Sequence, residues 1–157
     1  WDAASIKGFM LELGPVSSLF DIVTFAALFF VVCPAAVDAS WSELAAAGDV
    51  AGMVTFAALF QSGWFVESMW SQTLVVHMLR SPHLPSPRDH AAPALCVLTV
   101  LGLALVTWLP ASPIADALGL MPLPTSFFGL LIGIVTAYIA LTQLAKRRYI
   151  ARHGELL

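Results

Sequence analysis

Hydrophobic residues dominate four long stretches of this chain, and most charged residues lie in the connections between them. A bilayer core of about 30 Å is crossed by an α-helix of about 20 mainly apolar residues. Four stretches reach this length, at roughly Gly8–Val32, Gly52–Leu79, Ala92–Leu109 and Phe127–Ala145. Prolines gather after the second and third stretches, where the missing N–H donor of proline favours the end of a helix. The pattern predicts an all-α bundle of four transmembrane helices.

The composition favours a membrane protein over a soluble one. Of the 157 residues, 59% are hydrophobic and 11% are charged, whereas a soluble domain carries about 25% charged residues. A single soluble domain with a large core is the alternative, but uncharged runs at 22–37, 91–115 and 121–145 argue against it. We therefore expect residues 1–157 to form one integral membrane domain.

Basic residues mark one side of the predicted membrane. All seven lie before the first span, between the second and third, or after the fourth, at Lys7, Arg80, Arg88, Lys146, Arg147, Arg148 and Arg152. The other connections, 33–51 and 110–126, contain acidic residues but no Lys or Arg. Because cytoplasmic loops are enriched in Lys and Arg, both termini are predicted to be cytoplasmic. The run Lys146, Arg147 and Arg148 is predicted to anchor the last helix to anionic lipid at that surface.

Two local patterns fall on the opposite, external side. Ser40 and Glu43 have the spacing of a capping box, which predicts a short helix ending near Gly48, with an ordinary surface loop as the alternative. The heptapeptide VTFAALF occurs at Val23–Phe29 and again at Val54–Phe60. The two copies indicate either a local duplication or a shared packing solution in neighbouring antiparallel helices.

Two carboxyl groups are predicted near the middle of the membrane. Asp21 follows Lys7 by fourteen residues and Glu67 precedes Arg80 by thirteen, so each lies roughly 20 Å from the cytoplasmic end of its helix. A charged side chain at this depth costs at least ~2.5–3.5 kcal/mol on the most lenient scale. Such residues therefore face other helices or a water-filled path rather than lipid.

Other polar residues share a helix face with Glu67. Five of the polar residues of this helix fall within one arc of about 140°: Gln61, Glu67, Ser68, Ser71 and Gln72. Glu67, Ser71, Gln72 and Asp21 are the candidates for an ion pathway or a proton relay. The alternative is a structural polar seam in which both carboxyls are protonated and hydrogen-bonded.

The last span carries a stripe of small and polar residues. Its members recur at intervals of four, three, four and three residues, at Gly129, Gly133, Thr136, Ala140 and Gln143. Small residues allow the backbones of membrane helices to approach closely. The stripe predicts helix packing, either inside the protein or at the face of a dimer.

Several segments resemble the carboxy-terminal membrane region of bacterial magnesium-transporting P-type ATPases. The resemblance spans nearly the whole chain and lies in GPVSSLFDIVTF (14–25), LFQSGWFVES (59–68), SQTLVVHMLR (71–80), PLPTSFF (122–128) and LTQLAKRRYIARHG (141–154). It implies helices seven to ten of a ten-helix pump of the bacterial inner membrane that uses ATP to bring Mg²⁺ into the cytoplasm. It also implies that this chain is a segment of a longer protein and contains none of the catalytic residues, so it should not hydrolyse ATP alone.

The resemblance also implies the partners. These are the remaining helices and the cytoplasmic domains of the same pump, together with anionic lipid, and no nucleic acid. Mg²⁺ would be the transported ion, and its preference for oxygen ligands suits Glu67, Ser71 and Gln72. The connection at 34–51 is longer than is usual for the family, so no role is carried over to it. The rival interpretations are a four-helix structural or assembly protein without transport activity and a small proton-coupled carrier.

Overall fold

The computed structural model describes residues 3–79 and 93–153, and these residues form helices and short connections with no β-strand. The elements are α1 (Ala3–Ala27), the π-helical turn η1 (Leu28–Val32), α2 (Cys33–Val37), α3 (Trp41–Ala47), α4 (Val50–Leu79), α5 (Pro93–Trp108), the 3₁₀ turns η2 (Leu109–Ala111) and η3 (Asp116–Leu118), and α6 (Thr125–His153). Four helical stretches are long and apolar enough to cross a membrane: Gly14–Val37, Val50–His77, Ala94–Ala111 and Thr125–Ala151. The predicted four-helix bundle is confirmed.

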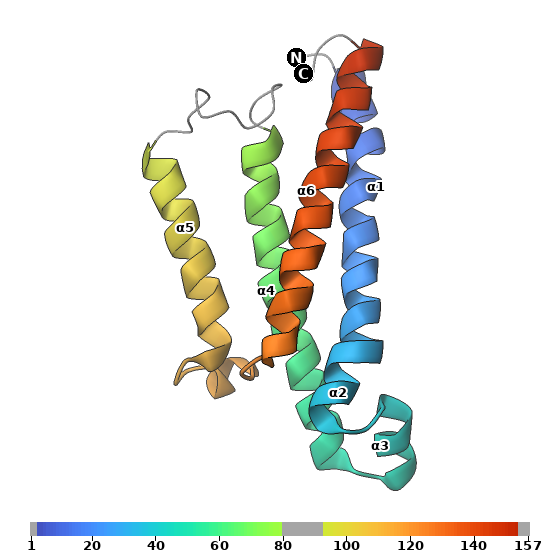
Figure 1. Ribbon diagram of the computed structural model, residues 1–157, viewed down its shortest axis with the longest axis vertical. Helices are drawn as coiled ribbons and strands as arrows, with labels where there is room; N and C mark the ends of the chain where they lie inside the picture. Colours follow the sequence, from blue (N-terminus) through green and yellow to red (C-terminus); the bar gives the residue numbers. More distant parts are fainter. Residues whose placement is uncertain (1–2, 80–92, 154–157) are drawn as a thin grey trace.

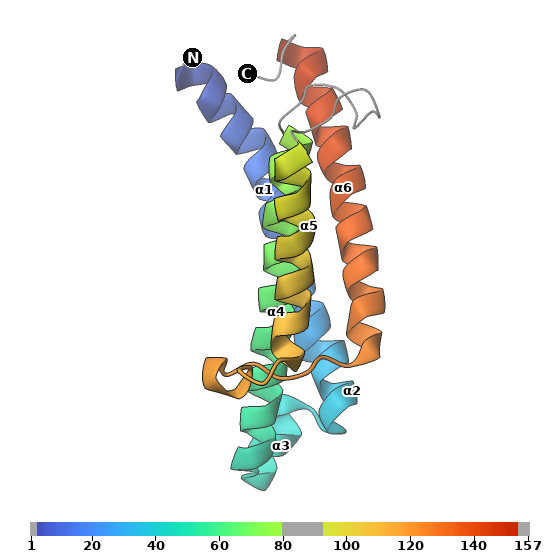
Figure 2. The ribbon, with the colours of Figure 1, turned by 90° about the vertical axis from the view of Figure 1, so that its left-hand side faces the viewer.

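Three of the long helices pack together, and the fourth lies at one side. α1, α4 and α6 contact one another, whereas α5 packs mainly against α4 (Figure 1). The start of α1, the end of α4, the start of α5 and the end of α6 all lie at the same end of the bundle (Figures 1 and 2). We call this the terminal end, and the end that carries α2 and α3 the loop end. This arrangement is the one expected for four antiparallel spans with both termini on one side.

The first transmembrane helix is longer than the sequence predicted. It continues past Val32 through η1 and α2 and ends only at Asp38, whose φ of 56° is left-handed. Pro34 does not stop it, because the π-helical turn η1 directly before it shifts the backbone hydrogen-bond register and accommodates the missing N–H donor. The last helix is also longer, since α6 continues eight residues beyond Ala145 to His153.

The short helix predicted after the first span is confirmed as α3. The backbone N–H of Ser40 donates to Glu43 Oε2 at 2.7 Å, and the backbone N–H of Glu43 donates to Ser40 Oγ at 3.4 Å. The Ser40 hydroxyl also donates to Glu43 Oε2 at 2.7 Å, and this bond together with the one from the Ser40 backbone N–H holds the pKa of the Glu43 carboxyl below its usual value. Gly48 ends the helix with a left-handed φ of 67°, as the sequence indicated.

The interior contains two apolar clusters. The larger one joins all four long helices and consists of Leu28, Val32, Val66, Val106, Phe127 and Leu131. The smaller one fixes α3 against α4 and consists of Cys33, Leu44, Phe56 and Leu59. α5 is also tied to α4 by hydrogen bonds from Trp70 Nε1 to Thr107 Oγ1 (3.0 Å) and between His77 Nε2 and Thr99 Oγ1 (2.6 Å).

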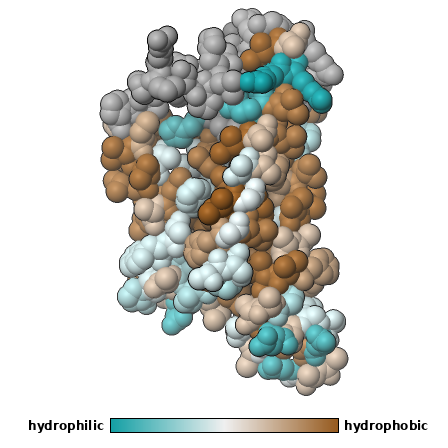
Figure 3. Space-filling view, viewed as in Figure 1, coloured by the Kyte–Doolittle hydropathy of each residue, from teal (hydrophilic) through white to brown (hydrophobic). Residues whose placement is uncertain are grey.

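Much of the outer surface is apolar. In the middle of the face drawn in Figure 3, hydrophobic side chains lie on both sides of a paler band of intermediate hydropathy, and strongly hydrophilic side chains gather toward its two ends. Large exposed side chains such as Ile22, Val100 and Ile132 are each more than 60% accessible. This distribution fits a surface that faces hydrocarbon in the middle and water at the ends.

Candidate functional site

Glu67 lies at the centre of a polar seam between α1, α4 and α6. Its side chain is 1% exposed and lies close to Asp21 and Thr24 of α1. From α6, the Tyr138 hydroxyl lies close to Ser17 and Thr142 and within electrostatic range of both carboxyls. We use the name polar seam for Ser17, Asp21, Thr24, Glu67, Tyr138 and Thr142. The seam brings together the two carboxyls that the sequence placed at similar depth.

Several buried atoms in and beside the seam make no hydrogen bond of good geometry among the described residues, although the Thr24 hydroxyl lies beside Glu67 and the Thr142 hydroxyl beside Tyr138. They are both carboxyl oxygens of Glu67, the Oγ1 atoms of Thr24 and Thr142, and Nε2 of Gln143. A buried polar atom left without a partner costs about 1–3 kcal/mol. Natural proteins keep such groups where another molecule, a moving ion or a function accounts for them.

The other predicted pathway residues are placed differently. Ser71 is buried, but its hydroxyl donates to the carbonyl of Ser68 on the same helix at 3.0 Å. Gln72 is exposed, and its Nε2 donates to Ser68 Oγ at 3.0 Å. The polar arc of α4 is therefore divided, with Glu67 and Ser71 inside this chain and Gln72 on its outer surface. A role of these residues as ion ligands stays a prediction.

Sequence reasoning missed the contribution of α6. Tyr138 and Thr142 were not identified as site residues, and Gln143 was assigned only to helix packing. Lys146 also departs from the expected surface position, since its side chain is 1% exposed while those of Arg147 and Arg148 are exposed. The spacing of Tyr138, Thr142 and Lys146, four residues apart, could have indicated a shared buried face.

The small-residue stripe of α6 faces away from the rest of the described chain. Gly129, Gly133 and Thr136 are exposed, and no atom lies within 4 Å of where a Cβ of either glycine would be. Gln143, in contrast, is buried. Packing of Gly129, Gly133 and Thr136 against another helix therefore stays a prediction that concerns helices outside the described residues.

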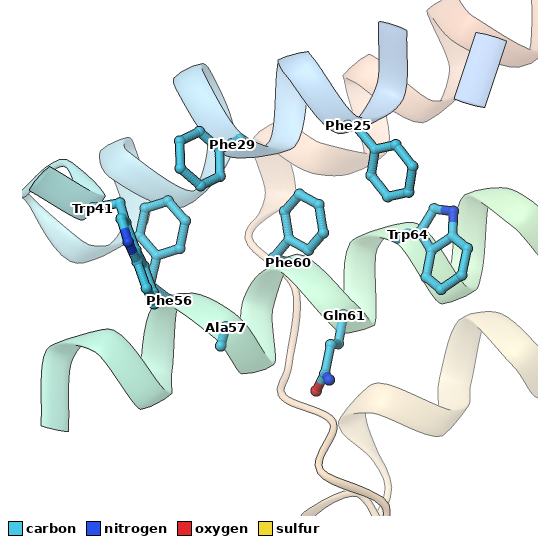
Figure 4. Close-up of a pocket in the computed structure, with 8 residues that line it drawn as sticks. All are labelled: Phe25, Phe29, Trp41, Phe56, Ala57, Phe60, Gln61 and Trp64. Carbon is cyan, nitrogen blue, oxygen red and sulfur yellow. The ribbon is translucent and has the colours of Figure 1, made fainter. Parts of the chain in front are cut away.

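An aromatic groove lies between α1 and α4 toward the loop end. It has a volume of about 540 Å³ and is lined by Phe25, Phe29, Trp41, Phe56, Ala57, Phe60, Gln61 and Trp64 (Figure 4). Four of these rings come from the two VTFAALF copies: Phe25 stacks on Phe60 at 5.5 Å, and Phe29 meets Phe56 edge-on at 5.4 Å. The repeated heptapeptide thus supplies equivalent rings from two antiparallel helices.

The part of the chain that the structure describes contains no group of three or more His, Cys, Asp or Glu side chains that could hold a metal ion. Mg²⁺ is bound in proteins mainly by oxygen ligands and retained water. The two carboxyls of the polar seam could supply part of such a ligand set, but not all of it.

Comparison with known proteins decides the family. A family model described as "Cation transporting ATPase, C-terminus" matches residues 2–148. The chain belongs to this family of cation-transporting ATPases.

The curated relatives of this family member are named as magnesium pumps. The chain is 41% identical over 155 residues to the "Magnesium-transporting ATPase, P-type 1" of Salmonella typhimurium and 38% identical over 154 residues to the protein of that name in Escherichia coli. These alignments cover 99% and 98% of this chain but 15% of each relative. The chain therefore spans about 15% of the length of the curated relatives it matches, and the resemblance seen in the sequence is confirmed.

Proposed function

We propose that this chain is the carboxy-terminal membrane part of an ATP-driven pump that moves Mg²⁺ into the cytoplasm across the bacterial inner membrane. The observation that carries the proposal is the similarity, over 99% of the chain, to a protein named as a magnesium-transporting ATPase. ATP binding and hydrolysis belong to parts of the pump outside this chain. The alternative, an assembly protein without transport activity, has no comparable observation in its favour.

Within the pump, we assign the polar seam a place beside the ion pathway. Glu67 and Asp21 provide carboxyl oxygens deep in the membrane segment, and Glu67 is enclosed by helices of this chain. Gln61 and Gln72 are exposed on α4, and the amide of Gln72 bonds to Ser68 of the same helix. Amide groups are costly to leave in hydrocarbon without further partners. This outward face suits contact with the remaining helices of the pump, which could complete the Mg²⁺ ligands together with Ser71 and Gln72.

The surface of the terminal end completes the proposal. Arg147 and Arg148 are exposed near the end of α6. Basic residues beside a transmembrane helix attract anionic lipid by about 1 kcal/mol each. We assign these two arginines to contact with anionic headgroups and the remaining cytoplasmic domains to the same side of the membrane.

Substitution of Glu67 tests the role of the seam. Glu67→Gln keeps the shape of the side chain and removes its negative charge. In the complete pump we expect normal folding and a Mg²⁺ concentration for half-maximal ATPase activity that rises about tenfold, which corresponds to 1.4 kcal/mol of lost ion stabilisation. The assay is Mg²⁺-dependent ATP hydrolysis of the purified pump together with its melting temperature.

The matched control is Glu43→Gln, the same chemical change at an exposed carboxyl of α3. It should leave the Mg²⁺ dependence unchanged. If Glu67→Gln also retains wild-type activity and Mg²⁺ dependence while Glu67→Leu lowers the melting temperature, Glu67 has a structural role only.

A further inference from the structure

Ser62 joins two parts of the chain that lie 59 residues apart. Its side chain is 0% exposed near the middle of α4. The hydroxyl donates to the carbonyl of Ala58 at 2.7 Å and accepts a bond from the backbone N–H of Met121 at 2.8 Å. A buried hydroxyl is costly unless it is hydrogen-bonded, and an alanine would suffice here for packing alone. The bond to Met121 is the long-range contact that an alanine could not make.

Met121 belongs to the connection between α5 and α6, residues 109–124, which we call the strap. The strap runs across the bundle from the end of α5 to the start of α6 (Figure 2). Its own backbone bonds hold it together, among them those from the N–H groups of Leu118 and Leu120 to the carbonyl of Ala115, both at 2.9 Å. Because the strap is a folded segment, a bond to one of its residues places the whole segment.

Little freedom remains between Met121 and the start of α6. Residues 122–124 are Pro-Leu-Pro, and each proline fixes its own φ. Leu123 packs against the larger apolar cluster, and the backbone N–H of Phe127 donates to the carbonyl of Pro124 at 3.0 Å. The position of Met121 is therefore passed on to the first turn of α6.

The apolar side chains of α6 select its register only weakly. Large apolar side chains are buried at Leu131 and Ile134, but an equally large one is exposed at Ile132. Hydrophobic attraction is non-directional, so it draws α6 to the bundle without firmly deciding which face turns inward. A slip by one residue would move α6 by about 1.5 Å and turn it by about 100°. Such a slip would carry Tyr138 away from Glu67.

We propose that Ser62 is a positioning residue that holds α6, through Met121, in the register that brings Tyr138 into the polar seam. The next residue of α4, Gly63, supports the same contact, because a Cβ there would lie 3.2 Å from Cε2 of Phe127. Adjacent residues of α4 thus fix the strap and the first turn of α6 together. The register is a property of this chain, whereas its effect on Mg²⁺ dependence rests on the proposed function.

The distance between α3 and the start of α6 measures the register. In the complete pump with its other cysteines replaced, spin labels on the exposed positions Ser42→Cys and Ser126→Cys report this distance by double electron–electron resonance. Ser62→Ala should shift and broaden the distance distribution. Thr55→Ala is the matched control, because the Thr55 hydroxyl donates to the carbonyl of Ala51 on the same helix at 3.0 Å, and it should have no effect. A wild-type distribution in Ser62→Ala would overturn the proposal.

A backbone substitution removes the other half of the bond. Replacing Met121 with its α-hydroxy analogue by nonsense suppression exchanges the N–H for an oxygen and leaves the bond from Ser62 to Ala58 in place. The labels should report the same change as in Ser62→Ala. If Ser62→Ala does not fold, this ester decides the question alone, and a wild-type distribution in it would overturn the proposal.

ATP hydrolysis tests whether the register affects the polar seam. Ser62→Ala should raise the Mg²⁺ concentration for half-maximal activity several-fold at a maximal rate near that of the wild type. The increase should be absent when Ser62→Ala is added to Tyr138→Phe, because effects that act through one residue do not add. Additive effects, or an unchanged Mg²⁺ dependence, would contradict the positioning role. If the wild-type pump shows no Mg²⁺ dependence, the proposed function fails, and the spin labels still decide the register.

Discussion

Gly63 shows how closely α1, α4 and α6 pack around the seam. A Cβ at this position would lie 2.5 Å from Leu28 Cδ2 and 3.2 Å from Phe127 Cε2. Leu28 is fully buried in the π-helical turn η1, so it has little room to move. The glycine thus lets α4 approach both neighbouring helices one turn from Glu67.

Gly63→Ala should therefore destabilise the bundle. Overpacking of a well-packed core costs about 1–3 kcal/mol, whereas Gly102→Ala, where no atom lies within 4 Å of the new Cβ, gains up to about 1 kcal/mol of helix propensity. Unfolding of the two variants of this chain in detergent, followed by circular dichroism, measures the difference. Equal or reversed stabilities would mean that Leu28 and Phe127 adjust without strain.

At the residue scale, sequence reasoning located the carboxyls but not all their surroundings. Glu67 and Asp21 could be placed at similar depth, because residues can be counted from the basic helix ends, but depth alone does not show that the two side chains meet. The spacing of Tyr138, Thr142 and Lys146 indicates a shared face of α6, but nothing within α6 shows that this face meets Asp21 and Glu67. Ser71 is buried and Gln72 is exposed because of where α1 and α6 contact α4. The sequence of α4 alone does not show where these contacts lie.

At the scale of the element, the number and approximate place of the helices followed from the length of the apolar stretches. The residues at which α1 and α6 end could not be predicted from these lengths. A proline such as Pro34 marks a helix end only when the residues before it are not helical. Here η1 keeps those residues helical by shifting the backbone hydrogen-bond register. The capping box of α3 was predictable because the bonds between Ser40 and Glu43 are local. That the small-residue stripe of α6 faces outward could be learned only from the packing of the whole bundle.

The exposed stripe of α6 gives a prediction that separates this chain from the complete pump. Gly133→Leu should leave the stability of the isolated chain unchanged, because nothing in the described residues lies near that position. In the complete pump it should lower the melting temperature, because a large side chain would keep a neighbouring helix away.

Differential scanning fluorimetry of both proteins tests this, with Ile132→Leu as a control that preserves a large exposed side chain on the same helix. An unchanged melting temperature in the complete pump would show that the stripe faces lipid.

At the scale of the whole molecule, the start of α1 and the end of α6 lie at the same end of the bundle (Figures 1 and 2), and the basic residues predict that this end is cytoplasmic. Single cysteines at Ser42 and Ala117, in a background with Cys33 and Cys96 replaced by alanine, should react with an impermeant thiol reagent applied to intact cells. A cysteine at Ser86, which lies outside the described residues, should react only after lysis. Labelling at position 86 in intact cells would contradict the predicted orientation.

The complete pump in lipid vesicles tests the central claim most directly. The vesicles are loaded with Mg²⁺ and a luminal Mg²⁺ indicator. ATP added outside is used only by pumps whose cytoplasmic side faces outward. Transport toward the cytoplasmic side predicts that luminal Mg²⁺ falls on addition of ATP and not of a non-hydrolysable analogue. Luminal Mg²⁺ that stays constant or rises while ATP is hydrolysed would contradict the account.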